Sequence, residues 1–345
     1  MTCNPLGHAA RRSLGVVVAL CLLATEPATA QPPAPTVNDL VYAKTVSDSG
    51  EPIELHLDLW MPLDRSARPR PLVIWVHGGA WLAGSYNAPP PGLRQLLRRG
   101  FAVASVQYRL SSQAIAPAQI HDIKGAVRFL RANAARRQLD PERFAVWGAS
   151  AGGHLAALLA TSGGVAESEG DVGGNVDQPS GVQAAVDYFG PTDLLRMQTD
   201  VADPPGSAID HDAPDSPESK LLGFTGPGRG VGVLREAADS RLTEFASEIA
   251  LAKLMNPIEH VDAHDPPIFI AHGEDDNVVP IEQSVRLAQK LAEAGVPHEL
   301  QRVAGAGHGF RAMSADVNSA AVDFLAERIG PATQKRRQAD AGSAE

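Results

Sequence analysis

The sequence predicts an α/β fold in which helices flank a mostly parallel central sheet. Two apolar runs, Pro71–Val76 and Phe101–Val106, have the length and composition of strands that are buried on both faces. Residues 92–99 between them have helical spacing and stop at Gly100, a typical residue after a helix end. Strand-like and helix-like stretches go on alternating through the chain, which is the pattern of a sheet built from βαβ units.

The remaining elements follow the same order. Residues 53–60 alternate apolar and polar side chains, as a half-buried strand does. Residues 118–137 carry apolar side chains at helical spacing and predict a long amphipathic helix. Further strands are expected at Phe144–Trp147, Val182–Phe189, Pro267–His272 and Glu299–Val303, and further helices at Gly153–Thr161 and Ser284–Ala294.

Several stretches lie outside this alternation. Residues 31–38 are rich in proline and are expected to form a tether before a domain that covers 39–331. Residues 163–181 are rich in Gly, Asp and Glu and predict a solvated loop. Residues 199–248 are dense in Pro, Gly and Asp and predict a small cap or loop insertion. The polar residues 332–345 are expected to be a disordered tail.

The first thirty residues have the pattern of a secretory signal peptide. Arg11 and Arg12 precede the apolar run Leu14–Ala24, and the small residues Ala28–Ala30 form a cleavage site of the A-x-A kind. The run is shorter than the roughly 20 residues that a membrane-spanning helix needs. We therefore expect an exported protein, secreted or periplasmic, without a membrane span.

Export has a consequence for the chemistry. The chain has two cysteines, Cys3 and Cys21, and both lie in the expected leader. The mature chain would then have neither a disulfide nor a thiol nucleophile.

The whole chain carries 30 Lys and Arg against 40 Asp and Glu, so its charge of −10 repels phosphate backbones and disfavours nucleic acid as a partner.

A candidate nucleophile lies at Gly148–Gly152, which reads G-x-S-x-G. The motif directly follows the strand ending at Trp147 and directly precedes an expected helix. This strand–turn–helix context is what the motif requires to expose its serine. It would lift the Ser150 hydroxyl above the sheet edge, where the helix N-terminus favours developing negative charge.

A second glycine-rich turn, His77–Trp81, follows the strand that ends at Val76. Consecutive glycines let backbone N–H groups turn toward a pocket, where they can stabilise the oxyanion of ester hydrolysis. We assign this role to the N–H groups of Gly78 or Gly79, together with that of Ala151.

A serine hydroxyl needs a histidine base, and the histidine needs a carboxylate to fix its tautomer. His308 lies in a glycine-rich loop after the last strand and is the expected base. The turn after the strand at 267–272 supplies three candidate acids, Glu274, Asp275 and Asp276, which spacing alone does not separate.

Other histidines fit this role less well. His77 and His272 precede turns and are expected to orient loops through hydrogen bonds. His154 follows Ser150 by one helical turn and is expected to point along the helix.

Long segments resemble the α/β-hydrolase superfamily and, within it, secreted esterases of the acetyl xylan and feruloyl esterase kind. They read HGGAW (77–81), YRLS (108–111), AQIHDIKGAVRFLRANA (118–134), GASAGGHLAALL (148–159), YFGPTDL (188–194), DSPESKLLG (215–223), NPI (256–258), DPPIFIAHGEDDNVVP (265–280) and GAGHGF (305–310). Related sequences read H-G-x-x-D-x-x-V-P, so the resemblance selects Asp276 as the acid. Ala80 and Ala149 depart from the hormone-sensitive-lipase-like branch, which usually has glycine and aspartate there.

The expected function is a serine carboxylesterase that acts on a small or polysaccharide-linked ester without metal or cofactor. Trp81, Tyr108 and Phe189 are expected to line the substrate pocket. Residues 210–215 are rich in aspartate and could bind calcium, although a solvated loop is the simpler interpretation.

Two alternatives remain. A peptidase of the prolyl-oligopeptidase type shares the order of catalytic residues, but too few residues precede Leu72 for its usual propeller. A non-catalytic binding protein of the same fold would be expected to have lost part of the triad.

Overall fold

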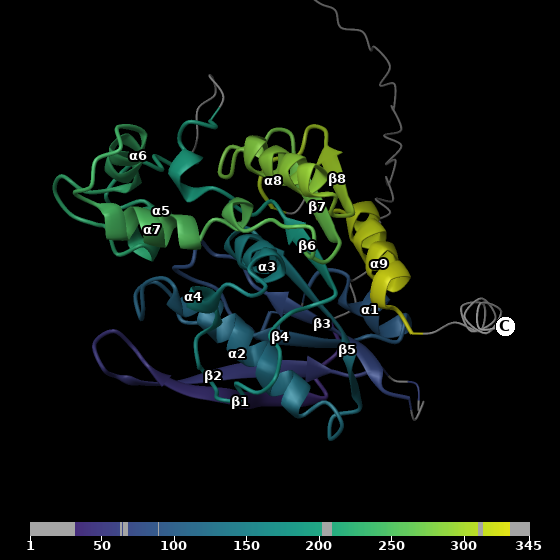
Figure 1. The fold of residues 1–345 in the computed structure, drawn as a ribbon. Helices are drawn as coiled ribbons and strands as arrows, with labels where there is room; N and C mark the ends of the chain where they lie inside the picture. The colour runs from purple at the N-terminus through teal and green to yellow at the C-terminus, as the bar shows by residue number, and fades with distance from the viewer. Residues whose placement is uncertain are drawn as a thin grey trace, which may run out of the picture. The chain divides into compact units, whose positions relative to one another are not determined.

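The computed structural model describes residues 32–331 except 63, 65–67, 89, 202–208 and 310–312. Within this part of the chain, an eight-stranded sheet has the order β1-β2-β4-β3-β5-β6-β7-β8 (Figure 1). The strands are β1 (Val37–Val46), β2 (Pro52–Trp60), β3 (Arg70–Val76), β4 (Ala102–Val106), β5 (Leu139–Ala149), β6 (Ala184–Tyr188), β7 (Ile268–Gly273) and β8 (His298–Val303). From β4 to β8 every neighbouring pair is parallel, and β2 joins β1 and β4 antiparallel.

Helices connect the strands, as the alternating sequence pattern predicts. They are α1 (Leu93–Arg98), α2 (Ala118–Ala132), α3 (Ala151–Thr161), α4 (Ala166–Glu169), α5 (Pro217–Leu221), α6 (Val231–Asp239), α7 (Ala246–Leu254), α8 (Ile281–Ala294) and α9 (Ala315–Ile329), with short 3₁₀ turns at Leu194–Arg196 and Pro257–Glu259. The predicted α/β class with a mostly parallel sheet is confirmed.

The sheet separates two apolar cores. In β3, Leu72 and Ile74 face the core shared with α2, α3 and α8, whereas Val73 and Trp75 face the core shared with α1 and α9. Successive side chains of a strand point to opposite faces, so a strand with a core on each side needs apolar residues throughout. This is why the apolar runs of the sequence predict these strands correctly.

Some boundaries differ from the prediction. The helix expected over 118–137 ends at Ala132, because the Asn133 amide donates to Phe129 O and the chain then turns through Gln138, whose φ is +55°. Strand β1 begins at Val37, inside the expected tether.

The stretch before β1 runs along the sheet and is not a free tether. Thr36 N–H donates to Leu59 O at 2.7 Å, and the Trp60 indole donates to Pro33 O at 2.8 Å. The tether prediction is therefore wrong for residues 33–38. The expected signal peptide, Gln31 and the expected tail lie outside the described residues.

The insertion at 199–248 contains α5, α6 and the start of α7. Leu221, Phe224 and Leu234 pack into the same core as α3, so the described part of the insertion is anchored in the domain. In the aspartate-rich stretch, Asp212 forms an ion pair with Arg235.

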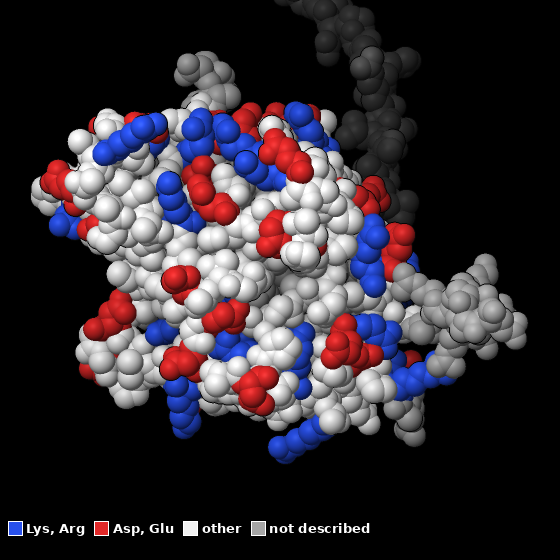
Figure 2. Space-filling model, in the orientation of Figure 1, with Lys and Arg blue, Asp and Glu red and all other residues white. Residues whose placement is uncertain are grey.

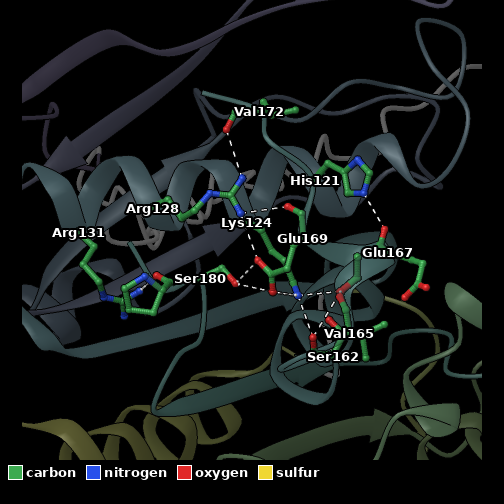
Figure 3. A network of polar contacts seen from close by, with 12 residues as sticks. His121, Lys124, Arg128, Arg131, Ser162, Val165, Glu167, Glu169, Val172 and Ser180 are labelled. Atoms are coloured by element: carbon green, nitrogen blue, oxygen red, sulfur yellow. Dashed lines mark hydrogen bonds and ion pairs between the residues drawn. The ribbon is translucent and has the colours of Figure 1, made fainter. Parts of the chain in front are cut away.

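The stretch 163–181 is not merely a solvated loop, because a buried polar network binds it to α2 (Figure 3). The Lys124 side chain is only 1% exposed, and its ammonium donates to Ser168 Oγ at 2.8 Å and Glu169 Oε1 at 2.7 Å. Arg128 pairs with the second oxygen of Glu169 at 3.2 Å. Glu169 thereby joins α4 to two cations of one helix.

Acidic and basic side chains are interspersed on the face shown in Figure 2, which carries no broad patch of one sign. Among the described residues, no helix is both long and apolar enough to cross a membrane.

Candidate active site

The candidate nucleophile lies between β5 and α3. Ser150 has φ 56° and ψ −124°, a conformation that costs a side-chain-bearing residue roughly 1–3 kcal/mol. Its N–H donates to Tyr188 O at 2.8 Å, which ties the turn to the neighbouring strand β6. The turn projects the hydroxyl from the carboxyl edge of the sheet, as the motif predicts.

Steric crowding explains the glycines on either side of Ser150. A Cβ at Gly148 would lie 1.9 Å from Gly152 O, and a Cβ at Gly152 would lie 2.1 Å from Val76 O. Both contacts are with backbone atoms, which cannot rotate away. Only glycine therefore allows β5, α3 and β3 to approach so closely at the serine.

The structure brings the three predicted catalytic residues together. His308 Nε2 lies 3.0 Å from Ser150 Oγ, and His308 Nδ1 lies 2.7 Å from Asp276 Oδ2. In this arrangement Nδ1–H donates to the carboxylate, so the Nε2 lone pair faces the serine hydroxyl. This is the geometry of a histidine that can take the proton of its nucleophile.

The position of the acid separates the three candidates. The Asp276 side chain is fully buried beside His308, whereas Asp275 is exposed to solvent. Glu274 pairs with Arg302 at 2.9 Å. Of the three, only Asp276 contacts the histidine base, which agrees with the choice that the family resemblance makes.

Four donors surround the Asp276 carboxylate. Oδ1 accepts from the N–H groups of Val278 and Val279, each at 2.9 Å, while Oδ2 faces His308 and His272. Burial by itself would raise the pKa of Asp276, but the hydrogen bonds from His272 and His308 hold that pKa well below its ordinary value. The carboxylate is thus ionised, as a group that stabilises an imidazolium must be.

His272 has a role that the sequence shows only in part. Its Nε2 lies 2.9 Å from Val279 O and 3.3 Å from Asp276 Oδ2, so this nitrogen carries the proton and faces two acceptors. Its Nδ1 accepts from the Ser284 hydroxyl at 2.7 Å. The prediction that His272 orients the turn is confirmed, and its contact with the catalytic acid is an addition. The only sequence signal is its position just before the acidic turn.

The expected oxyanion donors lie around Ser150. A Cβ at Gly78 would be 3.2 Å from Ser150 Cβ, so this backbone lies against the nucleophile. Gly79 has φ +119°, and its carbonyl accepts from the N–H groups of Leu82 and Ala83, which closes the turn. Ala151 is the first residue of α3, where N–H groups have no partner within the helix.

Tyr108 supports the oxyanion loop from behind. Its ring stacks on His77 with 4.4 Å between centroids, and its hydroxyl donates to His77 O at 3.1 Å. His77 Nδ1–H in turn donates to Gly78 O at 2.9 Å, which confirms the expected orienting role of His77. Because Tyr108 is only 1% exposed, the expectation that it lines the substrate pocket is not met.

Trp81 and Phe189 are also buried, each with 2% of its surface exposed. The Trp81 indole donates to His154 Nδ1 at 3.2 Å, so it anchors the loop to α3 and leaves little surface for a substrate. The Phe189 ring meets His308 edge to face at 4.7 Å between centroids. Phe189 therefore contacts the catalytic base, but its burial leaves little surface for substrate.

Among the described residues, no group of three or more His, Cys, Asp and Glu side chains is arranged to hold a metal ion. The site contains a hydroxyl nucleophile, a histidine base, a buried carboxylate and expected backbone donors. Together these groups can transfer an acyl group through a covalent serine intermediate.

Comparisons with known proteins agree with this chemistry. Esterase LipC of Mycobacterium tuberculosis is 29% identical over 272 residues, which is 78% of this chain and 60% of LipC. Esterase LipQ of the same organism is 30% identical over 69% of this chain and 50% of its own length. The chain thus spans about half to three fifths of the length of these curated relatives.

Two solved structures match this chain over nearly all of their own length. A truncated carbohydrate esterase from gut microbiota is 32% identical, with a TM-score of 0.68, and the match covers 84% of this chain and 94% of that one. Propionate-bound esterase 2 of Thermogutta terrifontis is 26% identical, with a TM-score of 0.63 over 88% of this chain and 98% of that one. These neighbours confirm the α/β-hydrolase fold, and the domain is that of a carboxylic ester hydrolase.

The sequence model of the BD-FAE family matches residues 57–291, which run from β2 into α8 and include Ser150 and Asp276. His308 lies beyond the match, on the loop that brings it back to Ser150. The chain belongs to the BD-FAE family.

Proposed function

We propose that this protein is an exported serine carboxylesterase that removes acetyl or feruloyl groups from plant polysaccharide. The observation that carries the proposal is the continuous contact from Ser150 Oγ through His308 to Asp276 Oδ2, with distances of 3.0 and 2.7 Å. A hydroxyl activated in this way attacks carbonyl carbons.

In the acylation step, Ser150 Oγ attacks the ester carbonyl carbon while its proton moves to His308 Nε2. The carbonyl oxygen becomes an oxyanion, which the N–H groups of Gly78 or Gly79 and Ala151 stabilise. The bond from carbon to the alcohol oxygen then breaks, and the alcohol leaves with the proton from His308. An acyl ester of Ser150 remains.

Deacylation repeats the sequence with water. His308 takes a proton as the water oxygen attacks the acyl carbon, and returns it to Ser150 as the carboxylic acid leaves. Asp276 stays ionised throughout and stabilises the imidazolium that forms twice per cycle. Removing a single oxyanion donor from an enzyme of this kind costs about 10²–10³ in rate, so the loop and α3 contribute much of the catalysis.

Two observations support the substrate and the location. The 32%-identical neighbour is described as a carbohydrate esterase, which favours an ester on a sugar polymer. Residues 1–30 have a basic pair, an apolar run and a small-residue cleavage site in that order, which favours export from the cytoplasm. Plant polysaccharides are found outside the cell, so export would bring the enzyme to them.

The reaction is tested by assaying purified protein on p-nitrophenyl acetate, methyl ferulate and acetylated xylan beside Ser150→Ala. We expect the wild type to hydrolyse the p-nitrophenyl ester and the variant to lose at least 10³-fold in kcat. Equal activity of the two proteins would disprove the serine mechanism. Activity on p-nitrophenyl acetate without release of ferulate or of xylan acetate would leave the esterase standing and refute the polysaccharide substrate.

Export is tested separately by expressing the full chain in a Gram-negative host and sequencing the N-terminus of the protein outside the cytoplasm. We expect it to begin at Gln31. Uncleaved protein confined to the cytoplasm would contradict the export proposal.

A further inference from the structure

His154 is a fully buried histidine that the hydrolytic mechanism does not use. It follows Ser150 by one turn of α3, and its N–H donates to Ser150 O at 2.9 Å. Its ring points away from the serine hydroxyl and lies between the oxyanion loop and the end of α7.

The two ring nitrogens have partners of opposite kind. Nε2 lies 2.6 Å from Met255 O, and a carbonyl only accepts, so Nε2 carries the proton. Nδ1 lies 3.2 Å from the Trp81 indole nitrogen, which only donates, so Nδ1 offers its lone pair. The contacts therefore fix one neutral tautomer, and the His154 and Trp81 rings meet at 90° with 5.2 Å between centroids.

Trp81 belongs to the loop that carries the expected oxyanion donors Gly78 and Gly79. The Trp81 residue has φ +57°, and its carbonyl accepts from Ser111 N–H at 2.8 Å. The backbone thus holds one side of this residue, and the indole bond to His154 holds the other. Through that bond the loop is fastened to α3, whose first residue, Ala151, is the other expected donor.

The other anchor of His154 is also fixed. Met255 follows α7 directly, and the next residue, Asn256, accepts from Leu194 N–H at 2.8 Å and donates to Asp193 Oδ1 at 3.0 Å. The carbonyl that holds the His154 ring is therefore part of a hydrogen-bonded buried segment. Movement of the ring would require that segment to move as well.

We propose that His154 is a positioning residue that sets the distance between the two halves of the oxyanion hole, the Gly78–Gly79 turn and Ala151. This inference rests on the proposed esterase function. Oxyanion donors act only when they are placed in advance to within about 0.5 Å, and they belong here to two separate elements. The chain Trp81–His154–Met255 joins these elements through side chains, beside the nucleophile but without touching the substrate.

The test compares Trp81→Phe, which removes the indole donor, with His154→Leu, which removes both ring contacts. We expect each to lower kcat on p-nitrophenyl acetate by about 10- to 100-fold, with KM changed by less than about threefold. The double variant should lose no more kcat than the worse single variant, because each substitution already removes the hydrogen bond between Trp81 and His154. His154→Asn, which keeps an acceptor near the position of Nδ1, should recover part of the loss.

Two measurements separate positioning from loss of stability. Binding of phenylboronic acid, whose adduct with Ser150 places an oxygen in the oxyanion hole, should weaken in parallel with kcat. Trp75→Phe is the matched control, because Trp75 is a buried tryptophan on the other face of the sheet whose indole nitrogen has no hydrogen-bond partner among the described residues. It should lower the melting temperature and leave kcat unchanged.

The inference is overturned if the variants keep kcat per titrated active site, or if boronate affinity does not follow kcat. If His154→Leu does not fold, Trp81→Phe and His154→Asn decide the question. An inert wild type would instead refute the proposed function and the inference together, whereas an active wild type with unaffected variants would refute the inference alone.

Discussion

Asp275 and Asp276 are neighbours in the chain, but their carboxylates lie in opposite environments. The Asp276 side chain is wholly buried between His308 and His272, while Asp275 is exposed to solvent. A single residue step along the turn thus separates the acid of the triad from a surface residue, and the two provide a matched pair of variants.

Asp276→Asn is expected to lower kcat by about 10⁴-fold. An amide that donates toward His308 Nδ1 would favour the wrong imidazole tautomer, so Nε2 could no longer accept from Ser150. Steady-state kinetics on p-nitrophenyl acetate measure the loss. Asp275→Asn should stay within about twofold of the wild type, and an equal loss in both variants would contradict the assignment of the acid.

Gly152→Ala is expected to destabilise the protein by about 3 kcal/mol or more, because its Cβ would lie 2.1 Å from the backbone oxygen of Val76. Thermal or urea unfolding measures this change. Gly163→Ala is the control, since a Cβ there meets nothing within 4 Å. Similar stability of the two variants would show that β3 and α3 are not packed as described.

Glu169→Ala is expected to destabilise the protein by about 3 kcal/mol, because it leaves the buried Lys124 ammonium without its carboxylate. Glu293→Ala removes a partner of the exposed Lys290 and should cost less than about 1 kcal/mol. Urea unfolding of both variants gives the comparison. Equal losses would mean that the network in Figure 3 does not stabilise the fold.

Because the Asp187 carboxyl is buried, we expect the free energy of unfolding to depend on pH. Its side chain is buried in β6, where Oδ1 accepts from Gly190 N–H at 2.9 Å and Oδ2 has no partner among the described residues. Burial raises the pKa of Asp187 from 3.8 to about 6. The folded state therefore favours the protonated acid, and stability is lost as the pH rises from about 4 to 6.

Asp187→Asn removes that titration. Relative to the wild type, the variant should gain about 2.5 kcal/mol of unfolding free energy between pH 4 and pH 8, because each pKa unit corresponds to about 1.4 kcal/mol and a small part of the loss has already occurred at pH 4. Any cost of burying the amide is the same at both pH values and cancels in this difference. Urea unfolding of both proteins at the two pH values makes the test, and a difference that does not change with pH would refute it.

The sequence alone determined those features of the protein that depend on residues close together in the chain. The apolar runs at 71–76 and 101–106 predict buried strands because each lies between two cores. The glycines around Ser150 predict a tight turn, and at Gly148 the crowding does come from within the motif, because a Cβ there would lie 1.9 Å from Gly152 O. His308 could be identified as the base from its place in a glycine-rich loop after the last strand, once Ser150 was taken as the nucleophile.

The tertiary structure decided what depends on contacts between distant segments. Trp81 and His154 are 73 residues apart, and Tyr108 lies 31 residues after His77, so no local pattern shows that these aromatic side chains support the loop. Spacing did not separate Asp276 from its neighbours; the family resemblance selected it, and its burial against His308 supplies the physical reason. Burial and hydrogen-bond partners are set by how segments pack, whereas turns and strands are largely set by the residues that form them.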